Sequence, residues 1–180
     1  MSGWADRLVA SGQADSDMVA QAERVLEAAA LRSGDTVLDV GAGLGLLTLA
    51  AHDRIGDGWV IAIDPSVDAL EELLALAHEA EMSGVMYLVG DADVLPLPDA
   101  SVDAAVLRSA LGRVPDLDTA IAELARVLRP DGRLSLREPV GPVEAGALEA
   151  SLVSAGFVAV ETTVEESADG TQLFARARRP

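Results

Sequence analysis

Cysteine and lysine are both absent from this chain, and each absence excludes a kind of chemistry. None of the 180 residues is cysteine, which excludes disulfides, thiolate nucleophiles and thiolate metal sites. None is lysine, so the 13 basic residues are all arginine and catalysis through a lysine Schiff base is excluded. The arginine bias, together with abundant alanine, is typical of codon usage, and we attach no function to it. We expect no metal site.

Positive charge and aromatic rings are also scarce. The chain carries 30 acidic residues against 13 basic ones, a formal net charge of −17, and only 3% of its residues are aromatic. Such a surface repels a phosphate backbone, and few rings are available to stack on bases. We therefore expect no nucleic-acid partner. The simplest role for the acidity is solubility.

Long hydrophobic runs are missing as well. Asp, Arg or Gly interrupts every apolar stretch well short of the roughly 20 residues that a membrane span needs. The first 17 residues lack the basic start and apolar centre of a signal peptide. We therefore expect a cytoplasmic protein without a membrane segment. A chain of 180 residues that is 50% hydrophobic suits one globular domain.

From residue 36 onward, short β-rich runs alternate with helical segments, which is typical of an α/β domain with a largely parallel sheet. The predicted strands are 36–40, 59–63, 85–89, 103–107 and 133–137, and the predicted helices are 46–54, 67–81, 117–128 and 143–155. Pro130 and Gly132 are expected to stop the third of these helices. After Gly156, two strands that meet at Asp169 and Gly170 predict an antiparallel hairpin.

The segment 1–35 is predicted to be an N-terminal helical segment, and 36–180 the main domain. Asp15 or Asp17 is available to cap a helix that begins there. Five apolar residues recur on one face of that helix: Met18, Ala22, Val25, Leu26 and Ala29. We expect this helix to pack on the sheet or to cover the site.

The most informative stretch is VLDVGAGLGLLTLA, residues 37–50, in which an apolar run ends in three glycines before a helix. Gly41, Gly43 and Gly45 allow positive φ angles and close approach of a ligand to the backbone, beside free N–H groups of the helix. A dinucleotide fingerprint would place its third glycine at position 46, where Leu46 stands. The spacing G-x-G-x-G resembles motif I of the class I S-adenosylmethionine (SAM)-dependent methyltransferases.

That resemblance covers residues 17–180 and implies the Rossmann-like methyltransferase fold, with helices on both faces of a sheet of strand order 3-2-1-4-5-7-6 and strand 7 antiparallel. It implies SAM as cofactor and S-adenosylhomocysteine as product. The implied cofactor-binding residues in and near the first strand are Asp39, Gly41, Ala42, Gly43, Leu44 and Gly45. Asp39 has the alternative of merely bracing the loop.

A carboxylate follows the second predicted strand in the sequence VIAIDPS. The resemblance implies that Asp64, next to Pro65, accepts hydrogen bonds from the ribose hydroxyls, while the alternative is that Asp64 or Ser66 caps the next helix. The segment GDADVLPLPDASVD, residues 90–103, resembles the methyltransferases of ubiquinone and menaquinone biosynthesis. By that resemblance Asp91 accepts from the adenine amino group and the N–H of Ala92 meets a ring nitrogen; the alternative is an Asp-rich surface loop.

Further along, LARVLRPDGRLSLREP resembles the helix, turn and fifth strand of the same subfamily, with Asp131 in place of a customary glycine. The backbone near Arg108 and Ser109 is expected to complete the cofactor site, with an ordinary surface charge as the alternative for Arg108. Many relatives carry two histidines where this chain has Gly112 and Arg113. No N-P-P-Y-like tetrapeptide follows the fourth strand, which argues against base-amine and glutamine-amide acceptors.

Two residues are candidate general bases, although methyl transfer by in-line displacement needs none. His52 follows the glycine loop, with a surface position as its alternative, and Glu138 ends the fifth predicted strand, where α/β sheets bind ligands. No inserted lid follows that strand. We therefore expect residues 1–35, the loop after the fourth strand or a second subunit of a homodimer to close the pocket, with Trp4, Leu8 and Val9 as lid residues unless the terminus is disordered.

The predicted function is methyl transfer from SAM to an oxygen, nitrogen or carbon of a small-molecule acceptor. The alternative is a methyltransferase-like module that binds SAM or S-adenosylhomocysteine without turnover and acts as a regulatory or interaction partner. A nicotinamide-dependent oxidoreductase is disfavoured by the glycine spacing and by the lack of a recognisable proton donor.

Overall fold

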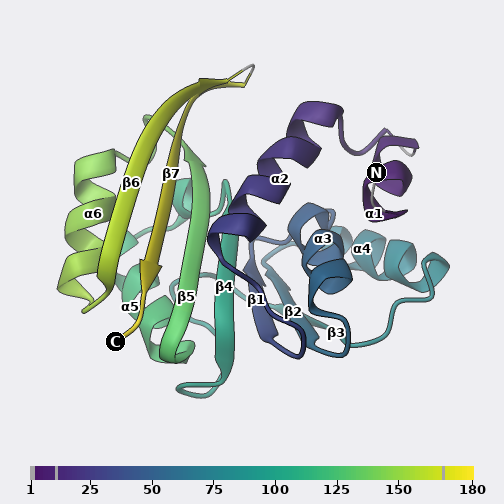
Figure 1. Cartoon of the computed structure of the whole chain (residues 1–180), viewed down its shortest axis with the longest axis horizontal. Helices are drawn as coiled ribbons and strands as arrows, with labels where there is room; N and C mark the ends of the chain where they lie inside the picture. Colours follow the sequence, from purple (N-terminus) through teal and green to yellow (C-terminus); the bar gives the residue numbers. More distant parts are fainter. Residues whose placement is uncertain (1–2, 11, 168) are drawn as a thin grey trace.

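Seven strands form one sheet in the order β3-β2-β1-β4-β5-β7-β6 (Figure 1). The computed structural model describes residues 3–10, 12–167 and 169–180. The strands are β1 (Thr36–Val40), β2 (Trp59–Asp64), β3 (Val85–Val89), β4 (Val102–Arg108), β5 (Leu128–Pro139), β6 (Val158–Ser167) and β7 (Gly170–Arg178). β1 to β5 pair in parallel, and β7 is antiparallel to both β5 and β6. The predicted strand order and the predicted hairpin are confirmed.

Helices cover both faces of this sheet, which explains why its central strands are almost wholly apolar. The helices are α1 (Gly3–Ala10), α2 (Ser16–Ala28), α3 (Leu46–Ile55), α4 (Val67–Glu79), α5 (Leu117–Val127) and α6 (Ala145–Ser154), with a short 3-10 turn, η1 (Leu111–Arg113). Residues of α1 to α4 form one hydrophobic core with one face of the sheet, and residues of α5 and α6 form a second core with the opposite face. Side chains therefore alternate between the two cores along each strand.

Polar side chains begin the helices where the sequence predicts them. Asp15 caps α2 by accepting a hydrogen bond from the N–H of Met18, and Ser66 caps α4 by accepting from the N–H of Ala69. Asp116 does the same for α5. Each cap satisfies an N–H that the first helical turn leaves without a partner.

The boundary between α5 and β5 differs from the prediction. The helix ends at Val127, and β5 begins at once with Leu128, which pairs with Val102. The register of the β4–β5 pair then shifts before Ala104. Because Pro130 has no N–H and the following turn contains Asp131 at a φ of 63°, the chain bulges here and rejoins the ladder at Arg133.

Within the predicted N-terminal helical segment, residues 3–10 form a separate short helix, α1, whose bounds the sequence patterns did not give. Trp4 and Leu8 of α1 are buried in the core with α2 and α3, whereas Val9 is exposed. Of the three expected lid residues, two are thus core residues of a short helix. The eight residues of α1 are too few for a periodicity signal, and packing holds them in place.

The carboxyl ends of the five parallel strands lie at one edge of the sheet. β1 lies between β2 and β4 in the sheet. β2 and β3 lie on one side of β1, and the chain then passes to the other side of β1 to form β4. Such a switch point leaves a crevice at the carboxyl ends of the strands, and the glycine loop follows β1 at this place. Within the described residues, no helix has the length and apolarity to cross a membrane.

Candidate functional site

The glycine loop leaves β1 with three residues in the left-handed region. The φ angles of Gly41, Gly43 and Gly45 are 72°, 50° and 90°. A Cβ at Gly41 would lie 2.8 Å from the Cβ of Ala110, and one at Gly45 would lie 2.1 Å from a methyl carbon of Leu73. Both positions therefore exclude a larger side chain because of backbone conformation and close packing. α3 begins directly after the loop, with Gly45 as its N-cap.

Asp64 lies at the carboxyl end of β2, opposite the glycine loop. One oxygen of its carboxylate accepts from the N–H of Gly43, and the other accepts from the N–H of Ser66, both at 2.8 Å. These bonds fix the plane of the carboxylate, and each oxygen keeps lone-pair capacity for a further donor. Ser66, not Asp64, supplies the cap of α4, which separates the two roles considered for Asp64.

The segment after β3 brings Asp91 and Ala92 to the same crevice. Asp91 is exposed and forms an isolated bridge with Val94, while Ala92 is buried. Two residues of α5 hold this segment, and the sequence reasoning missed both. Glu123 accepts from the N–H of Leu95, and Arg126 donates to the carbonyl oxygens of Leu95 and Leu97 and pairs with Glu123 and Asp99. Only their helical spacing, three residues apart, hinted at a pair.

A cavity of about 260 Å³ lies between these segments. It brings together seven of the predicted cofactor residues: Gly41, Gly43, Asp64, Pro65, Asp91, Ala92 and Arg108. Its opposite wall consists of residues that follow β4, among them Ser109, Ala110 and Arg113. The predicted site residues of β1, β2, β3 and β4 therefore meet in one place.

A second cavity of about 210 Å³ shares Gly41, Gly43 and Arg108 with the first. Three more predicted residues, Asp39, Ala42 and Leu44, line it, so that Gly45 is the only predicted cofactor residue that lines neither cavity. The remaining wall is largely apolar and comes from the N-terminal segment and α3: Leu8, Gln13, Met18, Leu46 and Leu47. Leu8 and Met18 are thus the residues through which α1 and α2 reach the site.

Asp39 is a carboxylate of β1 that is shut away from water. Its side chain is buried, and the hydroxyl of Thr48 in α3 donates to it at 2.6 Å. Burial raises the pKa of Asp39 to about 7, against the smaller lowering effect of the Thr48 hydrogen bonds. The bond joins β1 to the helix after the glycine loop, so Asp39 braces the loop from behind.

Glu138 does not reach either cavity. It is fully buried, and its carboxylate accepts hydrogen bonds from three consecutive backbone N–H groups, those of Ala110, Leu111 and Gly112. Burial raises its pKa, and the three N–H groups and the charge of Arg113 oppose that rise. Glu138 therefore anchors the turn after β4, which forms a wall of the first cavity, and we no longer expect it to act as a general base.

His52 is also away from the glycine-loop cavities. Its Nε2 lies 2.7 Å from the carbonyl oxygen of Ser83, and its ring lines a separate cavity beside Trp4 and Met82. The structure brings neither base candidate to the site. For His52, a surface position therefore agrees better with the structure than the role of general base.

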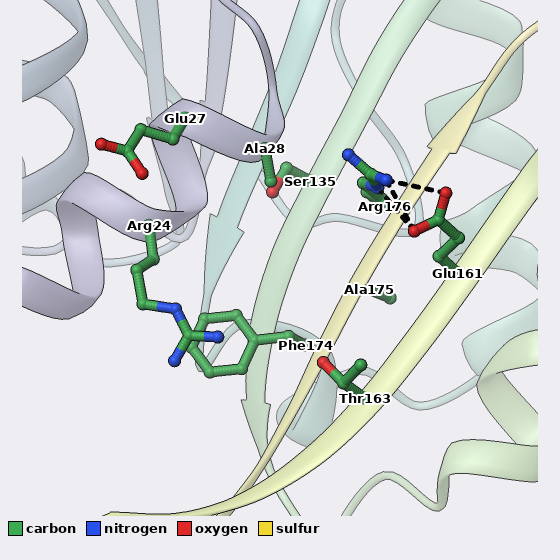
Figure 2. A pocket seen from close by; sticks show the side chains of 9 residues that line it. All are labelled: Arg24, Glu27, Ala28, Ser135, Glu161, Thr163, Phe174, Ala175 and Arg176. Atoms are coloured by element: carbon green, nitrogen blue, oxygen red, sulfur yellow. Dashed lines mark hydrogen bonds and ion pairs between the residues drawn. The ribbon is translucent and has the colours of Figure 1, made fainter.

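A larger cavity of about 350 Å³ lies far from the motif residues, between α2 and the β5–β7–β6 part of the sheet (Figure 2). Figure 2 shows Arg24 with its guanidinium over the ring of Phe174, 4.2 Å from the ring centre, and Arg176 paired with Glu161. Arg24 also pairs with Glu165. The positive charges here already have partners within the chain.

Comparison with known proteins connects the glycine-loop geometry with one family. A family model described as a methyltransferase domain matches residues 38–136, which include the glycine loop, Asp64 and Asp91. The chain belongs to this family. The predicted resemblance and the Rossmann-like class I fold are thereby confirmed.

Two curated relatives are methyltransferases by name. The nocamycin O-methyltransferase of Saccharothrix syringae is 35% identical over 122 residues, which are 67% of this chain and 44% of that protein. The ubiquinone/menaquinone biosynthesis C-methyltransferase UbiE of Teredinibacter turnerae is 33% identical over 115 residues, 63% of this chain and 46% of that protein. The chain therefore spans less than half the length of these relatives.

Solved structures of the same fold include two methyltransferases. One is a SAM-dependent methyltransferase from Aquifex aeolicus, with a TM-score of 0.76 and 24% identity over 88% of this chain and 89% of that one. The other is the phosphoethanolamine N-methyltransferase 2 of Haemonchus contortus in complex with S-adenosylhomocysteine, with a TM-score of 0.78 and 17% identity over 89% of this chain and 52% of that one. SAM is the cofactor that these comparisons indicate.

The residues at the crevice fit that cofactor. The glycine loop offers backbone without side chains at the point of closest approach, and the Asp64 carboxylate is oriented with free lone pairs for hydroxyl donors. The first cavity, with Asp64 and Asp91, suits the nucleoside part of the cofactor, and the second cavity adjoins it at Gly41, Gly43 and Arg108. Together their size is in the range of small-molecule sites.

Proposed function

We propose that this chain is a SAM-dependent methyltransferase that transfers the methyl group to an oxygen, nitrogen or carbon of a small-molecule acceptor. The observation that carries the proposal is the position of the Asp64 carboxylate, held by the N–H of Gly43 in the same cavity as Asp91. In this proposal Asp64 accepts from the ribose hydroxyls and Asp91 from the adenine amino group. Gly41, Gly43 and Ala92 contact the cofactor through their backbone.

The sulfonium of SAM supplies an activated methyl group, so the chain has mainly to align donor and acceptor. Such alignment contributes up to roughly 7 to 11 kcal/mol to lowering a barrier. The second cavity holds the acceptor in this proposal, because it adjoins the glycine loop and is lined by Leu8, Met18 and Leu44. An acceptor whose attacking atom already carries a free lone pair needs no base from the protein.

A small-molecule acceptor agrees with the charge of the chain. The net charge of −17 opposes a nucleic-acid acceptor, and the second cavity of about 210 Å³ accommodates a compact molecule. The N-terminal segment contributes Leu8 and Met18 to that cavity. We therefore propose that residues 1–35 form its cover, as expected from the missing insertion after the fifth predicted strand.

Calorimetric titration with SAM, S-adenosylhomocysteine and NAD tests the cofactor. We expect binding of the first two only, and Asp64→Ala to weaken it by about 1 to 3 kcal/mol through loss of charge-assisted hydrogen bonds. Asp68→Ala is the matched control, because Asp68 is exposed in the first turn of α4 and its side chain makes no hydrogen bond within the described chain. Unchanged affinity in the Asp64 variant removes Asp64 from the site, and absence of SAM binding refutes the proposal.

Turnover distinguishes an enzyme from a binding module. Release of S-adenosylhomocysteine is measured against a panel of small acceptors with hydroxyl, amine and activated carbon nucleophiles. Tight cofactor binding without turnover of any acceptor would favour the regulatory module over the enzyme.

A further inference from the structure

Three arginines stand out because this acidic chain leaves them without a partner. Of the arginine side chains that the structure describes, those of Arg32, Arg108 and Arg113 make no hydrogen bond and no ion pair. The protein has 30 acidic residues, so carboxylates are plentiful. These three arginines therefore lack partners because of where they lie in the fold. Two of the three, Arg108 and Arg113, line the cavity beside the glycine loop.

The surroundings single out Arg108 among these three. Arg32 is exposed and lines neither glycine-loop cavity. Arg113 lies close enough to Glu138 for its charge to lower the pKa of that carboxyl. Arg108 is half-buried, its Nε is shut away from water without a hydrogen-bond partner, and it lines both cavities. An unpaired guanidinium donor in such a position is costly unless a ligand supplies the acceptor.

A second arginine beside Arg108 increases that cost. Arg137 of β5 is the direct register partner of Arg108 in β4, and both lie on the face of the sheet that α2 covers. Arg137 is 2% exposed and its Nε also lacks a partner; its nearest described acceptors are Ser167 at 3.4 Å and Asp169 at 3.6 Å. Burial lowers the pKa of Arg137, and the charge of Arg108 lowers it further. Two cations are thus adjacent on this face of the sheet, and among the described residues the only ion pair that either makes is the one between Arg137 and Asp169.

From this geometry we infer that Arg108 binds a carboxylate group of the methyl acceptor, with Arg137 as the neighbouring positive charge. This inference rests on the proposed function. A guanidinium matches a carboxylate by two parallel N–H···O bonds, and the partly desolvated position strengthens them. Beyond the glycine loop, the second cavity has Gln13 and Asp39 as its other polar residues and is otherwise lined by apolar side chains: Leu8, Met18, Leu44, Leu46 and Leu47. The acceptor class that fits is therefore a small carboxylic acid with an apolar body.

The test uses matched pairs of acids and neutral amides as probes. The full chain, loaded with S-adenosylhomocysteine, is titrated calorimetrically with benzoate against benzamide and with cyclohexanecarboxylate against its amide. We expect each acid to bind about tenfold or more tightly than its amide. Arg108→Gln should abolish this preference, and Arg32→Gln, which removes an unpaired arginine outside the site, should keep it. Equal binding of acid and amide to the unaltered chain, or a preference that persists in Arg108→Gln, would overturn the inference.

The cofactor itself carries a carboxylate, so the experiment separates the two sources. Affinities for S-adenosylhomocysteine and for 5′-methylthioadenosine, which lacks the aminoacyl chain, are compared in the Arg108→Gln variant. We expect both to stay within about threefold of the unaltered chain, because Arg108 is expected to meet the cofactor only through its backbone, which the substitution leaves in place. Loss of S-adenosylhomocysteine binding alone would assign Arg108 to the cofactor and refute the acceptor site. If the unaltered chain binds no S-adenosylhomocysteine, the proposed function fails, while the acid preference of the free chain still decides the role of Arg108.

Discussion

The two walls of the site differ in charge and in how they are held. The wall from β1, β2 and the segment after β3 presents the carboxylates of Asp64 and Asp91, whereas the wall from β4 presents Arg108 and Arg113. At Asp64 the acidic wall is positioned by its own backbone, through the bond from the Gly43 N–H, and the segment that carries Asp91 is held by Glu123 and Arg126 of α5. The basic wall depends on a residue from a different strand, Glu138.

One buried carboxylate supports each wall, and the two carboxylates receive different numbers of hydrogen bonds. Asp39 receives one hydroxyl donor, from Thr48, and Glu138 receives three backbone N–H donors. Burial raises the pKa of both. A buried carboxylate is tolerated as an anion only to the extent that donors replace its water. At neutral pH, the buried carboxylate of Asp39 therefore lowers the stability of the folded chain, whereas that of Glu138 fixes the conformation of the turn after β4.

The largest effect is expected for Asp39→Asn as the pH changes. The pKa of Asp39 in the folded chain is about 7, against 3.8 for a free aspartate side chain, so between these values the folded chain holds a proton that the unfolded chain has lost. The contribution of Asp39 to stability therefore falls as pH rises from about 4 to about 7, by up to roughly 4 kcal/mol. The asparagine variant lacks this loss, and its free energy of unfolding relative to the unaltered chain should rise over that range.

Urea denaturation at several pH values measures this difference for Asp39→Asn and for Asp68→Asn, an exposed control. Other carboxylates, such as Asp103 with its lowered pKa, titrate in the same way in both chains and cancel. A difference that stays constant from pH 4 to 8 would contradict the raised pKa.

For the opposite wall, Glu138→Ala removes the acceptor of three N–H groups at once. We expect a loss of roughly 2 to 3 kcal/mol in unfolding free energy, because part of the exposed turn can recruit water. Glu138→Gln should lose less, since its amide retains a carbonyl acceptor. The matched control is Glu144→Ala, because Glu144 is exposed and its side chain makes no capping bond. Urea denaturation gives the stabilities.

The same Glu138 variants separate a positioning residue from a catalytic base. A positioning role predicts weaker S-adenosylhomocysteine binding in both variants, with partial rescue by glutamine. A loss of turnover with unchanged cofactor affinity would instead return Glu138 to the role of base.

Gly41→Ala changes a residue at the contact between the two walls, where Gly41 of the acidic wall packs on Ala110 of the basic wall. The new Cβ would lie 2.8 Å from the Cβ of Ala110, and alanine would have to keep a φ of 72°. We expect about 1 to 2 kcal/mol of destabilisation and weaker S-adenosylhomocysteine binding, from backbone strain and crowding together. Adding Ala110→Gly should recover the crowding part alone. Thermal unfolding and calorimetry of the single and double variants check this, and full recovery would show that the φ angle is unimportant.

The smallest effect is expected away from both walls, at the cavity of Figure 2. Arg176 and Glu161 are exposed over about half of their side chains, 53% and 60%, and such ion pairs contribute less than about 1 kcal/mol. Arg176→Gln should therefore change stability slightly and leave S-adenosylhomocysteine affinity unaltered. A large loss of cofactor affinity in this variant would mean that the larger cavity, and not the one at the glycine loop, holds the cofactor.

Much of the acidic wall could be predicted because its information is local. The bounds of β1 and β3 agree with the prediction, and Asp64 ends β2 at the spacing that a βαβ unit requires. The predicted helix after Asp15 begins at Ser16 with the expected cap. In each case, residues close in sequence determine both the element and the direction of its side chains.

The basic wall and the N-terminal helix could not be predicted in this way. Glu138 resembled a base because it ends a strand at the correct edge of the sheet, and only the turn at Ala110 to Gly112, folded onto it, reveals its partners. The helix α1 has no periodicity of its own that would identify it, and it is held by packing of Trp4 and Leu8. These features depend on contacts between segments far apart in the chain.

The sequence by itself determined the α/β class, the glycine loop and the carboxylates that meet it, because glycine spacing and strand periodicity are local requirements of the backbone. The tertiary structure alone decided which charges remain without partners. Arg108 and Arg137 are 29 positions apart and become neighbours only through the register of β4 and β5. Whether a charge is paired depends on the distances to all others, and those distances exist only in the folded chain.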